Sequence, residues 1–319
     1  MTEQLIRRLT EISGEKAVLL REPMRRHTTF RIGGPADVFV SPSETAEVPQ
    51  ILDACRAAGV PWFIMGNGSN LLVSDAGFRG VVIRIDSNLQ KINPPVPDRE
   101  TGSARIRAQA GALLSRLAAC ARDHSLEGMA FASGIPGTLG GAVTMNAGAY
   151  GGEMKQILTR AWVLDERDGL KELTVRELDL GYRSSRVKKD CLVVLEAEIE
   201  LKKGSKEEIT ARMEELKNAR ISRQPLEYPS AGSTFKRPEG YFAGKLIMDA
   251  GLRGRRIGGA QVSEKHCGFV INTGEASAAD VIELMELIRE TVYGQFGVRL
   301  EPEVQLLGFP EDIQAAVKA

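Results

Sequence analysis

The chain has 319 residues, of which 43% are hydrophobic and 26% are charged, as in ordinary globular proteins. Its 42 Lys and Arg residues balance 42 Asp and Glu residues, and this zero net charge argues against a general nucleic-acid or membrane-surface role. The sequence contains no run of about 18 consecutive apolar residues and no signal-peptide pattern. We therefore expect a cytoplasmic protein of two or three domains that does not span a membrane.

Cysteine and histidine are too sparse to suggest a disulfide framework or a metal site. The four cysteines are separated and form no Cys-x-x-Cys pair; they are Cys55, Cys120, Cys191 and Cys267. His266 precedes Cys267, but neighbours on an extended strand point to opposite faces, so a catalytic dyad is not expected. We predict reduced thiols and no bound metal.

Strands and helices alternate along the first half of the chain. A helix is indicated by apolar residues at helical spacing between Ser43 and Gly59, and a second one between Leu113 and His124. Strands are predicted at 36–40, 60–65, 80–85, 104–110, 160–164 and 191–199. A proline-rich turn at 93–98 separates the first lobe from the second, and the glycine-dense stretch after His124 reads as a loop.

The last third of the sequence has a different pattern. A hinge is predicted at 203–205, followed by a charged amphipathic helix from Lys206 to Arg223. Ser277 to Asp280 resembles a capping box that opens a helix closed by Gly297, and 298–304 leaves as an extended segment. The elements predict an α+β protein, with boundaries at 1–92, 93–203, 204–300 and 301–319.

Glycine, with 33 residues, is the unusual component of the composition, and it is clustered. Residues without a Cβ let backbone N–H groups approach a phosphate, and two clusters rich in Ser, Asn and Thr, at 66–70 and 133–143, satisfy that demand. The alternative is that they form only tight turns. The G-x-G-x-x-G and G-x-x-x-x-G-K-[ST] fingerprints are absent, so a nucleotide site would be of neither Rossmann nor P-loop kind.

Four motifs in one order give a specific resemblance. They are Thr28-Thr29-Phe30-Arg31-Ile32-Gly33-Gly34, Gly66-Asn67-Gly68-Ser69-Asn70-Leu71-Leu72, Gly134-Ile135-Pro136-Gly137-Thr138 with Asn146-Ala147-Gly148-Ala149-Tyr150, and Gly232-Ser233-Thr234-Phe235-Lys236. From about residue 20 to about 308 the chain resembles the UDP-N-acetylenolpyruvoylglucosamine reductase family, in its shorter form. The resemblance implies a two-lobed FAD-binding domain of the vanillyl-alcohol oxidase (PCMH) type and a C-terminal α/β substrate-binding domain.

The same resemblance assigns the domains and the cofactor residues. It implies FAD-binding lobes at 1–92 and 93–203, a substrate-binding domain at 204–300, and a C-terminal segment at 301–319 that returns to the active site. The implied FAD-binding residues are Gly66, Asn67, Gly68, Ser69, Asn70, Ser133, Gly134, Pro136, Gly137, Gly141, Asn146 and Gly148.

The family's reaction implies three catalytic positions. NADPH reduces FAD, and the flavin N5 then delivers a hydride to the vinyl carbon of UDP-N-acetylglucosamine enolpyruvate, giving UDP-N-acetylmuramate for peptidoglycan. Ser233 aligns with the proton donor, Arg183 with the residue that steadies the carboxylate, and Glu303 with the third catalytic residue. Glu301 is the competing carboxylate, which spacing alone does not exclude.

The remaining expectations concern the substrate and the alternatives. Candidates for substrate binding are Tyr150, Tyr182, Lys236, Arg237 and Lys245, although ordinary solvated or core roles remain open for them. We expect a monomer with no nucleic-acid or membrane partner. The rival interpretations are another flavin oxidoreductase of the same fold and a non-catalytic protein that binds a sugar nucleotide or flavin.

Overall fold

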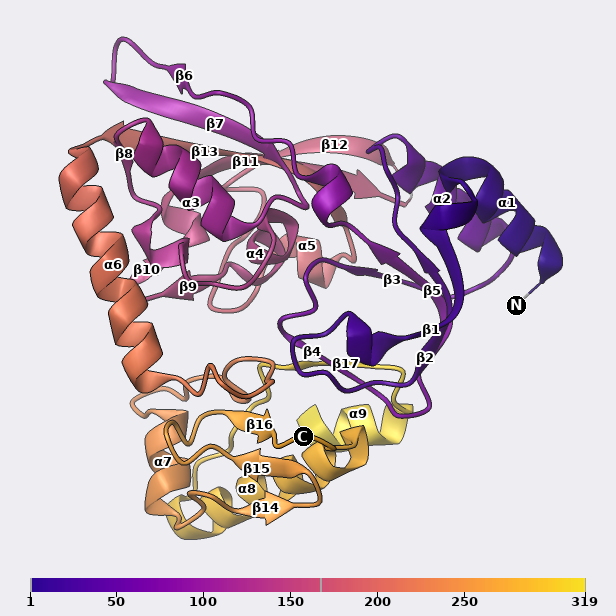
Figure 1. Cartoon of the computed structure of the whole chain (residues 1–319), viewed down its shortest axis with the longest axis vertical. Helices are drawn as coiled ribbons and strands as arrows, with labels where there is room; N and C mark the ends of the chain where they lie inside the picture. The colour runs from indigo at the N-terminus through magenta and orange to yellow at the C-terminus, as the bar shows by residue number, and fades with distance from the viewer. Residues whose placement is uncertain (1, 167, 319) are drawn as a thin grey trace. The chain divides into compact units, whose positions relative to one another are not determined.

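The computed structural model describes residues 2–166 and 168–318, with side chains as far as residue 315 (Figure 1). The chain forms two compact units. Unit 1 contains Met1–Leu19, Phe39–Asn67 and Val82–Arg220, and unit 2 contains Leu20–Val38, Gly68–Val81 and Ile221–Ala319. The domain boundaries inferred from the sequence stay a prediction, and each unit is described by itself.

Three strands and one helix run from one unit into the other along the chain. They are β1 (Val18–Pro23), β2 (Pro35–Val40), β5 (Phe78–Arg84) and α6 (Lys206–Arg223). The first three belong to a four-stranded sheet of order β1-β2-β5-β3, in which β3 is Trp62–Met65.

Unit 1 is built around a six-stranded sheet. Its further helices are α1 (Glu3–Ser13), α2 (Glu47–Ala57), α3 (Leu114–Asp123), α4 (Leu139–Met145) and α5 (Arg186–Lys189), with 3₁₀ turns η1 (Glu15–Ala17), η3 (Ser87–Leu89), η4 (Ala130–Ala132) and η5 (Met154–Gln156). Its further strands are β6 (Val96–Pro97), β7 (Ser103–Gln109), β8 (Leu126–Glu127), β9 (Gly148–Ala149), β10 (Gly152–Glu153), β11 (Leu158–Asp165), β12 (Gly169–Thr174) and β13 (Val193–Lys203). The sheet has the order β12-β11-β13-β7-β6, with β8 beside β13.

The long strand β13 shows why this sheet has two different faces. Successive side chains of a strand point to opposite sides, and in β13 Ala197, Ile199 and Leu201 are buried. Glutamates alternate with them, and α4 packs against the strand. One face of the sheet therefore belongs to the core and the other carries charge.

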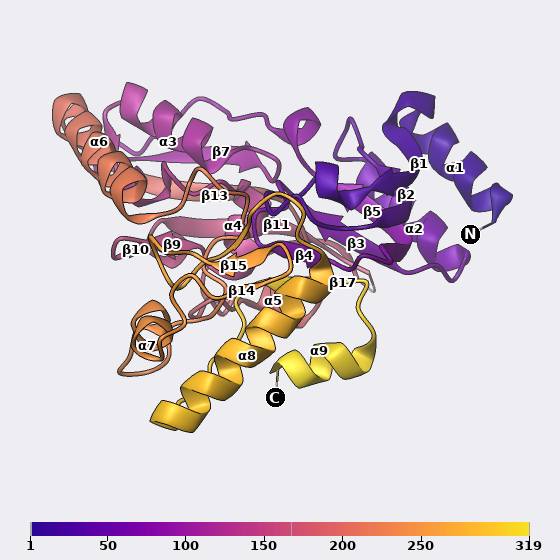
Figure 2. The ribbon, with the colours of Figure 1, turned by 60° about the horizontal axis from the view of Figure 1, so that its bottom comes forward.

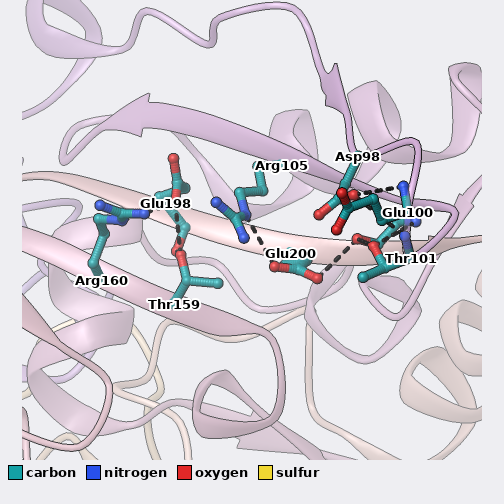
Figure 3. Close-up of polar contacts among 9 residues, drawn as sticks. Asp98, Glu100, Thr101, Arg105, Thr159, Arg160, Glu198 and Glu200 are labelled. Atoms are coloured by element: carbon teal, nitrogen blue, oxygen red, sulfur yellow. Dashed lines mark hydrogen bonds and ion pairs between the residues drawn. The ribbon is translucent and has the colours of Figure 1, made fainter.

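The charged face is a row of ion pairs between neighbouring strands (Figure 3). Glu200 on β13 pairs with Arg105 on β7, 3.0 Å away, and also accepts a hydrogen bond from Ser103. Glu198 pairs with Arg160 on β11 at 3.0 Å. The hydroxyl of Ser103 and the guanidinium of Arg105 together hold the pKa of Glu200 below its ordinary value. The charges on this face are therefore largely paired with one another.

Unit 2 combines one long helix with short strands. Its elements are η2 (Met24–Arg26), β4 (Leu71–Val73), α7 (Ala243–Asp249), β14 (Arg256–Ile257), β15 (Ala260–Val262), β16 (Val270–Asn272), α8 (Ala278–Phe296), β17 (Gln305–Leu307) and α9 (Glu311–Lys318). The order β14-β15-β16 forms an antiparallel sheet, and β17 runs parallel to β4 with Leu306 opposite Leu72. Helix α9 lies beside α8 (Figure 2).

Helix α8 organises the core of unit 2. Its buried face includes Val281, Leu284, Met285 and Ile288, which pack with α7 and the three-stranded sheet. The carboxylate of Asp75 accepts hydrogen bonds from the first two backbone N–H groups of the helix, at 2.8 and 3.1 Å. The segment that precedes β5 is therefore fixed to the start of α8.

The structure confirms most of the expected elements. Helix α6 has the predicted limits, and the capping box of Ser277 and Asp280 opens α8, which ends at Gly297 with a φ of 68°. One prediction is wrong: the glycine-dense stretch, expected to be a loop, contains helix α4. The segment 298–304 links α8 to β17, which begins at Gln305.

Helix α4 was hidden by its glycines, which are poor helix formers. Gly140 packs so closely that an added Cβ would lie 2.9 Å from the Cβ of Ala110. Leu139 and Val143 are fully buried, so tertiary packing stabilises the helix. The mixed content confirms the α+β class, and within the described residues no helix is long and apolar enough to cross a membrane.

Candidate functional site

Two glycine-rich turns lie against each other in unit 1. The Nδ2 of Asn67 donates a 2.8 Å hydrogen bond to the carbonyl of Pro136. An added Cβ on Gly66 would lie 2.2 Å from the Oγ1 of Thr138, so that position requires glycine. The structure thus joins the turn after β3 to the turn before α4.

The second turn combines fixed and open backbone. Gly137 accepts a hydrogen bond at its carbonyl from the N–H of Leu114, and Ser133 donates its hydroxyl to Ala130. Gly134 and Gly141 are exposed, and a Cβ on Gly141 would have only one neighbour, at 3.7 Å. These two positions are therefore accessible to solvent.

Arg220 of α6 lies next to this turn. An added Cβ on Gly134 would be 3.2 Å from its Cδ and 3.3 Å from its Nη1. Burial lowers the pKa of Arg220, and nearby Tyr150 acts in the opposite direction. In the described part of the chain the guanidinium has no hydrogen bond or ion pair. Because a partly buried cation without a counter-ion is unfavourable, its surroundings favour a bound anion.

Asn146 holds the segments around α4 together. It is 1% exposed and adopts a left-handed conformation with a φ of 41°. Its Nδ2 donates to the carboxylate of Glu153 at 3.1 Å and to the carbonyl of Gly181 at 3.0 Å, while its Oδ1 accepts from the N–H of Lys155 at 2.9 Å. The amide is thus occupied within unit 1, where it fixes the loop before α5.

That loop carries Arg183. The loop is closed by pairing between Gly181 and Ser184, and the backbone of Arg183 itself has a φ of 52°. The Nη2 of Arg183 donates to the carbonyl of Gly148 at 3.2 Å, and its guanidinium lies 5.0 Å from the ring centroid of Tyr182. Ser185 donates its hydroxyl to the carbonyl of Thr144 at 2.6 Å, which ties the loop to α4.

Ser233 and Glu303 lie on paired segments of unit 2. The N–H of Glu303 donates a 2.8 Å hydrogen bond to the carbonyl of Thr234, the residue after Ser233. Phe235 and Pro302 form a β-bridge beside this bond. Both predicted catalytic side chains are partly buried. Two residues far apart in the sequence are thus held next to each other by the main chain.

Asn70 supports the Glu303 segment. Its Nδ2 donates to the carbonyl of Glu303 at 3.1 Å, and its own carbonyl accepts from the N–H of Gln305 at 3.0 Å. Gly68 has a φ of 61°, and its carbonyl accepts from the N–H of Thr29. Ser69 between them is partly buried. These residues form the turn that leads into β4.

The two competing carboxylates differ in their surroundings. Glu301 is exposed and forms a 2.9 Å ion pair with Lys236, whose N–H also donates to the carbonyl of Glu301. Glu303 is partly buried. A carboxylate already neutralised by a lysine at the surface is a poor candidate for substrate chemistry, which favours Glu303.

The other predicted substrate residues are exposed. Arg237 donates to the carbonyl of Tyr241 and lies 3.9 Å from the ring centroid of Phe242, and Lys245 pairs with Asp249 at 2.7 Å. Tyr150 and Tyr182 in unit 1 are 39% and 51% exposed, which excludes a core role for them.

Sequence reasoning missed Arg220 and His266. In the sequence Arg220 is one of many charged residues on a charged helix, and no sequence pattern indicates that it is partly buried. His266 was set aside because its neighbour Cys267 faces elsewhere, yet its ring accepts a hydrogen bond from the main chain near Thr234. Only the folded chain reveals either environment. Among the described residues no cluster of His, Cys, Asp and Glu is placed to hold a metal.

Two family models match the chain. One is an FAD-binding domain over residues 36–173, and the other is the C-terminal domain of UDP-N-acetylenolpyruvoylglucosamine reductase over residues 224–307. The first covers both glycine-rich turns, and the second covers Ser233 and Glu303. The expected FAD-binding fold and cofactor are therefore confirmed.

Similar proteins cover almost the whole chain. A UDP-N-acetylenolpyruvoylglucosamine reductase of Agathobacter rectalis is 52% identical over 97% of this chain and 99% of its own length. One of Clostridioides difficile is 48% identical over 94% of this chain and 96% of its own length.

A solved structure is also similar to this chain over most of its length. The crystal structure of UDP-N-acetylenolpyruvylglucosamine reductase from Thermus caldophilus matches with a TM-score of 0.74 and 35% identity, over 91% of this chain and 98% of its own. The chain therefore belongs to the UDP-N-acetylenolpyruvoylglucosamine reductase family, FAD-dependent oxidoreductases of peptidoglycan synthesis.

Proposed function

We propose that the protein uses NADPH as the electron donor to reduce UDP-N-acetylglucosamine enolpyruvate to UDP-N-acetylmuramate, with Arg183, Ser233 and Glu303 as the catalytic residues. The observation that carries the assignment of roles is the hydrogen bond from Glu303 N–H to the carbonyl of Thr234, which keeps Ser233 and Glu303 on adjacent segments. Bound FAD supplies the hydride that reaches the terminal vinyl carbon. Residues of the chain must then stabilise the negative charge that develops on the substrate and donate one proton to it.

Arg183 is proposed to bind the substrate carboxylate. After hydride addition, negative charge develops on the carbon next to that carboxylate and spreads onto its oxygens. A guanidinium forms two parallel hydrogen bonds to a carboxylate and can follow this growing charge. The fixed backbone of the 181–185 loop supports this role because it limits where the long side chain can reach.

Ser233 is proposed to donate the proton. A serine hydroxyl is a weak acid in water, but the carbanionic substrate carbon is a much stronger base. Proximity then decides which donor acts, and a donor held at one carbon has a large advantage over solvent. The main-chain contacts of Thr234 restrain the adjacent Ser233, which supports this role.

Glu303 is proposed to orient or polarise the substrate carboxylate. Its place beside the segment of Ser233, together with its partial burial, favours it over Glu301. The carboxylate of Glu301 is instead engaged in an ion pair with Lys236. A comparison of Glu303→Gln with Glu301→Gln tests the choice, since only the first is expected to slow substrate reduction.

The glycine-rich turns and Arg220 are proposed to hold the FAD diphosphate. Gly134 in the turn and Gly141 in the first turn of α4 are exposed, and the guanidinium of Arg220, which has no ion pair among the described residues, lies next to Gly134. This combination of exposed backbone and a partly buried cation fits a dinucleotide phosphate. Lys236, Arg237 and Lys245 remain proposals for the substrate diphosphate, as Tyr150 and Tyr182 do for the nucleotide.

An anaerobic visible spectrum of the purified protein tests the proposed function. NADPH is expected to bleach the flavin band, and UDP-N-acetylglucosamine enolpyruvate is expected to restore it. A flavin that bleaches but ignores the substrate would indicate another oxidoreductase of this fold. A protein without a flavin band, even after incubation with FAD, would contradict the proposal. NADH in place of NADPH tests the choice of donor in the same experiment.

The oligomeric state and location are parts of the same proposal. We propose a monomeric, cytoplasmic enzyme, and sedimentation of the FAD-loaded protein measures the first property. A stable dimer at micromolar concentration would contradict it. Fractionation of the producing cells, followed by assay of NADPH-dependent reduction, measures the second.

A further inference from the structure

The turn from Ser263 to Val270 holds the residue next to Ser233. The carbonyl of Gly268 accepts a 2.9 Å hydrogen bond from the N–H of Thr234, and the N–H of Val270 donates to the Oγ1 of Thr234 at 3.0 Å. Thr234 is 5% exposed, and its carbonyl accepts from the N–H of Glu303. Thr234 is therefore bonded on one side to this turn and on the other to the Glu303 segment.

His266 fixes the geometry of that turn. Its Nδ1 accepts a 3.1 Å hydrogen bond from the N–H of Gly268, the residue whose carbonyl receives Thr234. Its ring contacts the ring of Phe269 edge-on at a centroid distance of 5.1 Å. An added Cβ on Gly268 would lie 2.9 Å from the imidazole Cε1, and one on Gly244 of α7 would lie 3.2 Å from it. The ring is thus enclosed by the turn and α7.

The hydrogen bond requires one form of the ring. A backbone N–H can donate only to an imidazole nitrogen that carries a lone pair, so Nδ1 must be unprotonated and any ring proton must be on Nε2. Burial lowers the pKa of His266, which keeps the imidazole in the neutral form. The backbone N–H of His266 in turn donates to the hydroxyl of the buried Ser263.

We propose that His266 is a positioning residue for proton donation by Ser233, acting through the sequence of contacts from its Nδ1 to Gly268 and from Gly268 to Thr234. The inference rests on the proposed role of Ser233. His266 itself does not touch the substrate in this scheme. Loss of its acceptor leaves the Gly268 N–H unpaired and frees the turn to shift, and small displacements of a donor lower its rate sharply.

The test compares two amides that differ by one methylene. The Oδ1 of Asn stands at the same number of bonds from the backbone as the Nδ1 of His, so His266→Asn can retain the acceptor. The Oε1 of Gln lies one bond further, so His266→Gln is expected to lose it. The rate of flavin reoxidation by UDP-N-acetylglucosamine enolpyruvate is measured by stopped flow after NADPH reduction. We expect a loss of about tenfold or more for His266→Gln and about threefold or less for His266→Asn.

The first half-reaction serves as an internal control for folding. Reduction of the flavin by NADPH is expected to stay within about twofold of the wild type in both variants, because no proton from Ser233 is used there. A general loss of structure would slow both half-reactions. Equal rates of reoxidation for His266→Gln and the wild type, or equal losses for the Asn and Gln variants, would overturn the inference.

Ser233→Ala, measured beside them, separates this inference from the proposed function. If Ser233→Ala reoxidises slowly while His266→Gln is normal, only the inference about His266 fails. Normal reoxidation of Ser233→Ala would instead remove the proposed proton donor.

If His266→Gln does not bind flavin, a second pair of variants replaces it. Thr234→Val removes the acceptor for Val270, whereas Thr234→Ser retains a hydroxyl. Slower reoxidation in Thr234→Val with recovery in Thr234→Ser is expected. Identical behaviour of that pair would contradict the premise of the inference, that contacts between Thr234 and this turn position Ser233.

Discussion

The two units hold their proposed catalytic residues in different ways. In unit 1 the loop of Arg183 is fixed largely by side chains, with Asn146 and Ser185 as its anchors. In unit 2 Ser233 and Glu303 lie on segments that are joined mainly by backbone hydrogen bonds through Thr234. A substitution can remove a side-chain anchor, but it leaves a backbone bond in place.

This difference matches the two tasks. In its proposed role Arg183 reaches a carboxylate with a long side chain, and an anchored loop with a left-handed residue gives that side chain a defined starting point. A proton donor acts at a single carbon and depends on smaller displacements. We therefore expect unit 1 to respond to loss of single anchors with changes in substrate binding, and unit 2 to respond with changes in rate.

The largest effect is expected from Ser233→Ala. Reoxidation of the flavin by the substrate should fall about 10²–10⁴-fold, the usual contribution of a positioned general acid. Reduction by NADPH should be unchanged, and stopped-flow spectra separate the two steps. Ser230→Ala is the matched control, because only the carbonyl of Ser230 is used, by the hydroxyl of Thr29. Equal rates of flavin reoxidation in Ser233→Ala and Ser230→Ala would contradict the proposed role of Ser233 as proton donor.

Asn146→Ala should have the next largest effect. It removes side-chain bonds to Glu153, Gly181 and Lys155 and leaves buried groups unpaired, so the free energy of unfolding should fall by about 2–4 kcal/mol. The KM for the enolpyruvyl substrate should rise as the Arg183 loop loosens. Urea unfolding and steady-state kinetics measure the two effects.

Asn67→Ala is the control for this stability effect. Its side chain donates an exposed hydrogen bond to the carbonyl of Pro136, and loss of this bond should lower the free energy of unfolding by about 1 kcal/mol or less. A larger loss in Asn67→Ala than in Asn146→Ala would contradict the view that side-chain anchors fix unit 1.

Arg220→Met should weaken FAD binding about 10–100-fold, because it removes a charge-assisted contact to the diphosphate. Flavin fluorescence during titration of the apoprotein gives the dissociation constant without any assay of turnover. Arg223→Met, an exposed residue one turn further along α6, is the control and should bind FAD normally. If Arg220→Met bound FAD with unchanged affinity, Arg220 would not be a ligand of the FAD diphosphate.

A smaller, pH-dependent effect is expected at the start of α8. Backbone hydrogen bonds from Ser277 and Gly259 lower the pKa of Asp280 below its ordinary value. Because the folded state prefers the carboxylate, this stabilisation is complete above the unfolded pKa and is lost as pH falls through the lower, folded pKa. Thermal unfolding between pH 2 and 7 should show a weaker pH dependence in Asp280→Asn.

The smallest effect is expected on the charged face of the unit 1 sheet. Glu200→Gln removes a partly exposed ion pair with Arg105, and such pairs contribute about 0–1 kcal/mol. Urea unfolding should therefore barely distinguish this variant from the wild type. A loss of about 3 kcal/mol or more would mean that the row of ion pairs, rather than the anchors around α4, stabilises the unit.

The sequence revealed the elements whose signals are local. Periodic apolar residues defined α6, and the capping box and Gly297 defined α8. Helix α4 escaped because its stability comes from packing Leu139 and Gly140 rather than from propensity. The parallel pairing of β4 with β17 joins distant segments, and no local pattern encodes it.

The residues of the candidate site also differ in how far the sequence could predict them. Ser233, Arg183 and Glu303 were located by resemblance, and their roles stay predictions. Composition and spacing indicated phosphate-compatible glycines but could not separate Gly140, which packs on Ala110, from the open Gly141. The burial of Arg220 and the bond accepted by His266 depend on contacts between distant segments, so they were beyond the reach of the sequence.

The pairing of β4 with β17 also bears on how the protein is made. Leu72 can find its partner Leu306 only after nearly the whole chain has been synthesised, because the strands lie near opposite ends of the sequence. Early contacts of β4 in a nascent chain must therefore be temporary, and its edge needs protection from other extended segments until translation is almost complete. A premature stop shortly before residue 305 would remove few residues and yet leave the segment of Glu303 without its closing strand.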